Sequence, residues 1–131
     1  MTRRAARGGE RGAAVVDFVL VLVVLVPLFL GIFQVGLVLH VRNTLTAAAS
    51  EGARYAATVD RPPTAGAERT RQQIAGAVAA RFARQVSARP VSVHGAPGVE
   101  VDVSAEVPAL GIWGPAVPLH VSGHAIEEQA P

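Results

Sequence analysis

The sequence predicts an α+β protein in which a long N-terminal transmembrane helix continues into a stalk, and one amphipathic helix then packs on a small three-stranded antiparallel sheet. Three observations predict this class. An apolar run from Phe18 to Leu39 has Gln34 as its only clearly polar side chain. A segment with helical periodicity follows the run, and the last part of the chain alternates apolar and polar residues with the period of two that is typical of strands.

The apolar run is long enough to cross a membrane. Its 22 residues rise about 33 Å as a helix, which matches a hydrocarbon core of about 30 Å. Residues 1–12 hold four Arg and one Glu and are predicted to form a disordered basic leader. Four Arg on this side against Arg42 on the other predict a cytoplasmic N terminus. Pro27 is expected to kink the span or loosen one hydrogen bond.

The helix is expected to continue beyond the membrane. Residues 41–59 are rich in Ala and lack Pro, and Ala is the best helix former. Ala48, Gly52 and Ala56 recur every fourth position, so a second helix can approach closely on that face. Pro62 and its neighbour Pro63 are expected to end the helix.

The remaining residues predict one helix and three strands. Ile74, Val78, Phe82 and Val86 recur at four-residue spacing, which predicts an amphipathic helix from about Ala67 to Ser87. The first strand is expected from Pro90, followed by a turn over Gly95–Gly98. The second strand is expected from Val99 to Val107 and the third from Val117 to about Ile126. We expect Ile74, Val78 and Phe82 to pack on Val99, Val101 and Val103.

The predicted organisation therefore has three parts: a basic leader (1–12), a transmembrane and stalk helix (13–59), and a small extracytoplasmic α+β domain (60–131). In the loop before the third strand, Trp113 is expected to pack over the edge of the core; contact with a membrane surface or a partner subunit is the alternative.

Composition and residue spacing argue against nucleic-acid binding, metal binding and catalysis. The chain has no Cys, and residues 43–131 hold seven Arg against eight acids, without the clustered positive charge of a nucleic-acid interface. His94, His120 and His124 are too dispersed to hold one metal ion, since two of them lie about 13 Å apart on a strand. Glu100, Asp102 and Glu106 read as the solvated face of a strand. We expect no enzyme activity, no cofactor, no metal and no small-molecule substrate.

The segment RGAAVVDFVLVLVVLVPLFLGIFQVGLVLHVRNTLTAAASEGARYAA resembles the TadE-like pseudopilins of Tad/Flp-type systems, within the type IV pilin-like proteins. The resemblance rests on a Gly, an acid, a mid-helix Pro, a Gly–aromatic-x-x-Gly stretch and the exit Glu-Gly-Ala-Arg. It implies an inner-membrane protein cleaved by a prepilin peptidase, with Gly12 as the last leader residue and Ala13 as the first mature one. Partners would be other pilin-like subunits and proteins of the pilus machine.

The resemblance also implies roles for Asp17 and Phe18, the fifth and sixth mature residues. The acid of a neighbouring subunit would neutralise the new α-ammonium of Ala13 inside an apolar assembly. The family's usual acid is Glu, one methylene longer than Asp17. Two alternatives stay open: an unprocessed single-pass anchor that presents a small binding domain, and a secreted domain released by signal peptidase near Ala47–Ala49.

Overall fold

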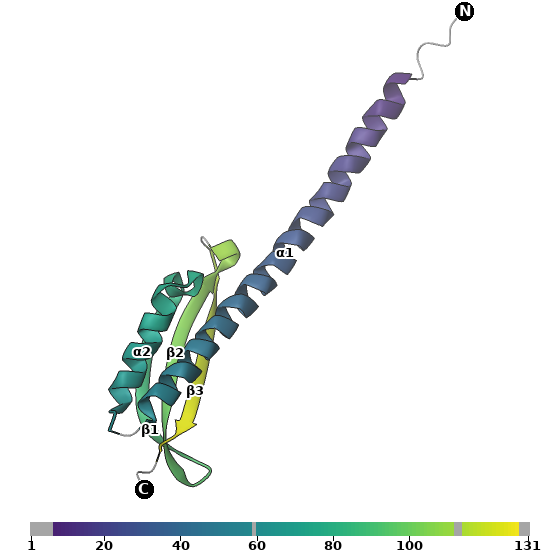
Figure 1. Cartoon of the computed structure of the whole chain (residues 1–131). Coiled ribbons are helices and arrows are strands. Elements are labelled where there is room, and N and C mark those ends of the chain that lie inside the picture. The colour runs from purple at the N-terminus through teal and green to yellow at the C-terminus, as the bar shows by residue number, and fades with distance from the viewer. Residues whose placement is uncertain (1–6, 59, 112–113, 129–131) are drawn as a thin grey trace, which may run out of the picture.

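The computed structural model describes residues 7–58, 60–111 and 114–128, and it has the predicted α+β architecture. A 50-residue helix α1 (Arg7–Ala56) is followed by α2 (Pro63–Ala75), a 3-10 turn η1 (Val78–Arg81), strands β1 (Ala83–Val93) and β2 (Ala96–Pro108), a second turn η2 (Ala109–Gly111) and strand β3 (Ala116–Ile126). The first half of α1 projects alone from the domain, and the second half lies along the sheet (Figure 1). Trp113 lies outside the described residues.

Helix α1 runs without interruption through Pro27, so the expected kink does not break it. Its 50 residues reach about 75 Å. The helix ends at Ala56, a few residues before the Pro62–Pro63 pair that cannot continue it. Pro63 then begins α2, in the first-turn position where the missing N–H of proline costs nothing.

The predicted second helix from Ala67 to Ser87 is wrong in both bounds. Helix α2 ends at Ala75 with Gly76 as its C-cap, and residues from Ala83 onward belong to β1. The physical reason lies in β2, whose length requires a partner strand of similar length: Ala83 pairs with Ala105 and Val86 with Val103. The four-residue spacing of Val86 with Phe82 is therefore a coincidence, because the sheet decides the conformation of this segment.

Three antiparallel strands form the sheet in the order β1-β2-β3. The second and third strands confirm the predicted ranges. The hairpin between β1 and β2 turns at His94 and Gly95, not over Gly95–Gly98, and both residues have positive φ (52° and 85°), as a two-residue type I′ loop requires. Pro90 and Pro118 both lie in edge strands, where a missing backbone donor is tolerated.

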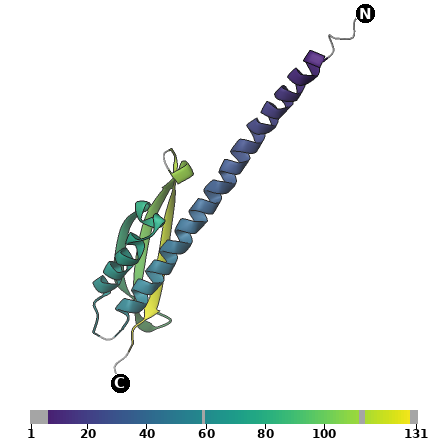
Figure 2. The same ribbon diagram turned by 45° about the horizontal axis from the view of Figure 1, so that its top comes forward.

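Both helices cover the same face of the sheet (Figures 1 and 2). The buried core joins α1, α2, the η1 region and all three strands; its larger members are Val41, Leu45, Ile74, Phe82, Val101, Val103, Val107 and Val121. Ile74 and Phe82 are buried with the Val99–Val103 face as predicted, although Phe82 follows η1 and Val78 belongs to it. The α1 residues predicted as a stalk, among them Val41, Leu45 and Ala49, are thus part of the core.

Glycines allow α1 to approach its neighbours closely. A Cβ on Gly52 would overlap the Thr70 hydroxyl and lie 2.6 Å from the carbonyl oxygen of Gly66. A Cβ on Gly123 of β3 would lie 2.5 Å from the Cα of Ser50. The small-residue face predicted at Ala48, Gly52 and Ala56 therefore receives a helix, and that helix is α2 of the same chain.

Candidate functional site

The residues predicted for processing and assembly lie in one stretch at the start of α1. Gly12, Ala13, Asp17 and Phe18 are all helical and exposed. A Cβ on Gly12 would meet no atom within 4 Å, and 63% of Phe18 is exposed. Among residues whose side chains the structure describes, none forms an ion pair with Asp17. The monomer thus leaves this stretch available to other molecules.

Ala13 and Asp17 are four residues apart, so they lie on the same side of α1 and about 6 Å apart along its axis. The pairing that the resemblance implies is between subunits, so it stays a prediction that this single chain does not test. Phe18 follows on an adjacent side. Among residues 7–58, 60–111 and 114–128, no other helix or strand lies beside this part of α1, because the sheet begins much farther along the helix (Figure 1).

The rest of the projecting helix is an apolar surface. Helix α1 contains an 18-residue window of mean hydropathy 2.9, none of which is buried in the protein. A core helix of a soluble protein would bury such a surface, whereas α1 exposes its Val, Leu, Ile and Phe side chains between Val15 and Val35. This part of α1 belongs to a single helix that is long enough and apolar enough to cross a membrane.

An apolar groove of about 530 Å³ lies on this exposed helix, lined by Pro27, Leu28, Gly31, Ile32 and Val35. A Cβ on Gly31 or Gly36 would meet nothing within 4 Å. These glycines therefore differ from Gly52, whose space the chain fills with its own α2. Gly31 is the small residue of this groove, a type that lets helices pack closely in membranes.

Gln34 joins the projecting part of α1 to the end of β2 and the η2 turn. Its side-chain oxygen accepts a hydrogen bond from the N–H of Leu110 at 2.6 Å, and its side-chain nitrogen donates to the carbonyl of Pro108 at 3.3 Å. Both partners lie at the η2 turn, more than seventy residues away in sequence. Sequence reasoning missed this contact; a lone amide in an apolar run was the only signal for it.

The acidic strand face is neutralised by arginines, as expected for a solvated surface. Arg89 of β1 binds Glu100 and lies 3.5 Å from Asp102, both on β2, and Arg84 lies 3.3 Å from Glu106. The hydrogen bond and charge of Glu100, followed by the charge of Asp102, raise the pKa of Arg89. Such exposed pairs contribute little to stability, because water and salt screen them. Within the described ranges, no three His, Asp or Glu side chains converge on a point where they could hold a metal ion.

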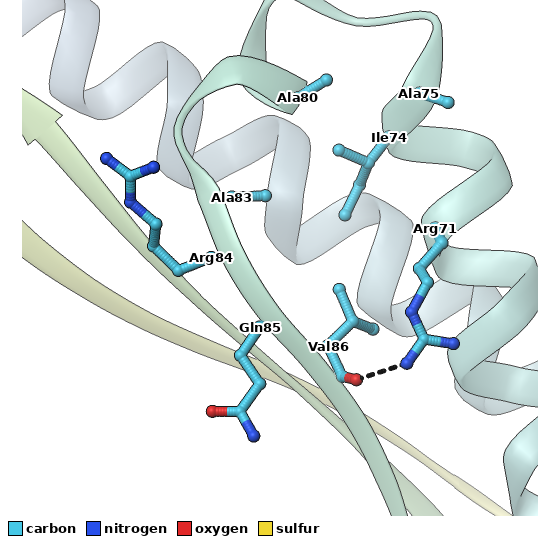
Figure 3. A pocket seen from close by; sticks show the side chains of 8 residues that line it. All are labelled: Arg71, Ile74, Ala75, Ala80, Ala83, Arg84, Gln85 and Val86. Carbon is cyan, nitrogen blue, oxygen red and sulfur yellow. Dashed lines mark hydrogen bonds between the residues drawn. The ribbon is translucent and has the colours of Figure 1, made fainter.

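A cavity of about 250 Å³ lies between the end of α2 and the start of β1. Figure 3 shows Ile74 and Val86 at its wall and Arg71 reaching across it. The Arg71 guanidinium donates to the carbonyl of Val86 at 2.8 Å and to Glu68. Its donors are therefore used to join the helix to the edge strand, and the cavity presents mainly Ala side chains beside them.

These features fit a single-pass membrane protein with a small α+β domain built around the far end of its membrane helix. The model of the family described as TadE-like protein matches residues 12–54, about a third of the chain. This match confirms the resemblance to the TadE-like pseudopilins over the segment that contains the junction and most of α1. Searches of curated proteins and of solved structures found no match to the chain.

Proposed function

We propose that this protein is a TadE-like pseudopilin, a structural or assembly component of a Tad/Flp-type pilus or secretion system and not an enzyme. The observation that carries the proposal is that the TadE-like match covers residues 12–54, a segment that includes the part of α1 whose apolar side chains stay exposed between Val15 and Val35. The protein would lie in the inner membrane with its N terminus in the cytoplasm, supported by the four Arg of the leader. Its α+β domain would lie outside the cytoplasm.

Maturation would consist of cleavage between Gly12 and Ala13 by a prepilin peptidase. The exposure of both residues supports this step, as does the open space around Gly12. Cleavage removes the basic leader and leaves a new α-ammonium on Ala13 at the membrane boundary. A residue without a side chain at position 12 lets the scissile backbone approach the peptidase closely.

Asp17 would pair with that ammonium in an adjacent subunit. The carboxylate lies on the part of α1 that enters the bilayer, where an ionised side chain is costly unless paired. Its exposed position, one turn beyond Ala13, supports a partner from another molecule. Such a pair sets the axial register of subunits, because removing one partner leaves a buried charge uncompensated.

The test is maturation of the full chain in membranes that contain a prepilin peptidase. Wild type should lose residues 1–12, and Gly12→Leu should keep them, because the added side chain obstructs the scissile bond. The matched control is Gly9→Leu, the same substitution inside the leader, which should be processed normally. The measurement is intact mass after extraction. Masses showing that wild type and Gly12→Leu both keep residues 1–12 would remove the main support for this function.

An unprocessed anchor is the competing function, and one observation favours it. Gly12 and Ala13 lie within the hydrogen-bonded backbone of α1, so the first turns must open before a protease can bind them. The intact mass separates the two functions, since an anchor keeps residues 1–12 under every condition. Release near Ala49 by signal peptidase is disfavoured by the core, because it would remove the buried Val41 and Leu45 from the domain.

A further inference from the structure

The contact between α1 and η2 fixes how far the domain stands from the lipid. Gln34 is bonded to η2, and just beyond it Leu37, Val38 and Val41 pack into the core, so α1 is committed to the domain from Gln34 onward. The stretch from Arg11 to Gln34 rises about 35 Å, and a hydrocarbon core needs about 30 Å of it. The bilayer therefore occupies nearly all of this stretch, and Gln34 lies at the level of the lipid headgroups. This placement lies toward the N terminus of the apolar run Phe18–Leu39, because Leu37 and Val38 of that run pack against the domain.

The η2 turn lies at that same level, and three backbone groups at this turn are hydrogen-bonded within the protein. The N–H of Leu110 and the carbonyl of Pro108 both bind Gln34, and the N–H of Ala109 donates to the carbonyl of Pro115 at 3.2 Å. A backbone group without a partner costs several kcal/mol against lipid. These internal bonds suit a turn that lies where water is scarce.

Leu110 supplies a third observation. It has left-handed backbone angles (φ 56°, ψ 16°), which are uncommon for any residue other than glycine and strained for a bulky one. In this conformation 38% of the Leu110 surface stays exposed, and Val117 near the start of β3 is 40% exposed. A strained residue that keeps an apolar side chain exposed is a feature typical of a functional contact.

We propose that the domain rests on the membrane surface, with η2 and the first residues of β3 against the lipid headgroups and Gln34 as the joint that holds it there. The occupant of this surface is the bilayer that α1 crosses. The inference rests on the membrane-spanning part of the proposed function. It is independent of processing and of any pilus partner.

The chain lacks cysteine, so single substitutions report depth directly. Leu110→Cys and Val117→Cys place a nitroxide label at the proposed surface, and Val26→Cys places one inside the span. His94→Cys labels the opposite end of the sheet, about 40 Å away along β2. The full chain is reconstituted in vesicles of phosphatidylethanolamine and phosphatidylglycerol, and collision rates with oxygen and with a water-soluble nickel chelate give the depth of each label.

Labels at positions 110 and 117 should collide with the nickel chelate several-fold less often than the label at 94, and more often than the label at 26. The proposal is overturned if positions 110 and 117 are as accessible as 94 while position 26 lies in hydrocarbon, an outcome that leaves the membrane span intact. If position 26 is itself accessible to nickel, the span fails together with the proposal.

The role of Gln34 is tested with the same labels. Gln34→Leu keeps the span apolar and removes both hydrogen bonds, so nickel accessibility at positions 110 and 117 should rise several-fold with position 26 unchanged. Ile32→Leu, an exposed apolar substitution on the same helix, is the matched control and should change neither. Unchanged accessibility at 110 and 117 in Gln34→Leu would show that the joint does not hold the domain at the membrane.

Discussion

Gly52 is the position where one added methyl group tests the packing of α1 on α2 most directly. In Gly52→Ala the new Cβ would overlap the Thr70 hydroxyl and lie 2.6 Å from the Gly66 carbonyl oxygen. Thr70 cannot move aside freely, because it is fully buried and its hydroxyl donates to Gly66 O at 2.9 Å, with Ala48 O as a second acceptor at 3.3 Å. The two helices must therefore separate.

Two opposing free energies determine the size of the effect. Ala is favoured over Gly inside a helix by about 1 kcal/mol. Overpacking a close contact costs about 1–3 kcal/mol, and a clash with both a side chain and a backbone oxygen places Gly52→Ala near the upper end of that range. The net destabilisation is about 2 kcal/mol, which for a domain of this size lowers the Tm by about 10 °C.

The assay is thermal unfolding of the full chain in detergent, followed by the β-sheet signal in circular dichroism. Gly36→Ala is the control on the same helix, since a Cβ there meets nothing within 4 Å, and its Tm should equal or exceed that of wild type. Adding Thr70→Ala to Gly52→Ala should cost less than the sum of the single changes, because it removes one of the clashing atoms. A Gly52→Ala protein as stable as wild type would refute the packing described here.

Two further predictions concern the core and the junction. Val101→Asp should unfold the domain, because an unpaired carboxylate at a fully buried site costs several kcal/mol, comparable with the whole stability of a small domain. The control Ser104→Asp, on the opposite face of the sheet, should stay folded. A cooperative melt of Val101→Asp at the wild-type temperature would contradict the face assignment. Asp17→Ala should insert and fold normally but fail to co-purify with pilus-system proteins. Asp17→Glu should co-purify normally, and Asp17→Asn should fall between the two. Equal recovery of pilus-system proteins with all three variants, at matched membrane levels, would favour the anchor function.

The sequence determined the elements whose cause is local. Alternation of Val99, Val101 and Val103 with acids predicts β2, since period two places these valines on one face whatever the partner. The apolar run predicts α1 because a helix hydrogen-bonds the polar backbone groups of such a long apolar segment within the segment itself, as lipid requires. The candidate site at Gly12 and Asp17 could be located for the same reason, since it depends on the order of residues along one helix.

Tertiary structure decided the features that depend on distant partners. Residues 83–87 favour a helix locally, yet pairing with β2 makes them a strand. Hydropathy cannot separate residues that face lipid from residues that face a sheet, because both environments are apolar; only the packing of Val41 and Leu45 on the strands shows where the membrane helix becomes the core of the domain. The hydrogen bonds of Gln34 to Pro108 and Leu110 likewise depend on the tertiary structure. These partners are so far away in sequence that no local pattern around Gln34 predicts the contact.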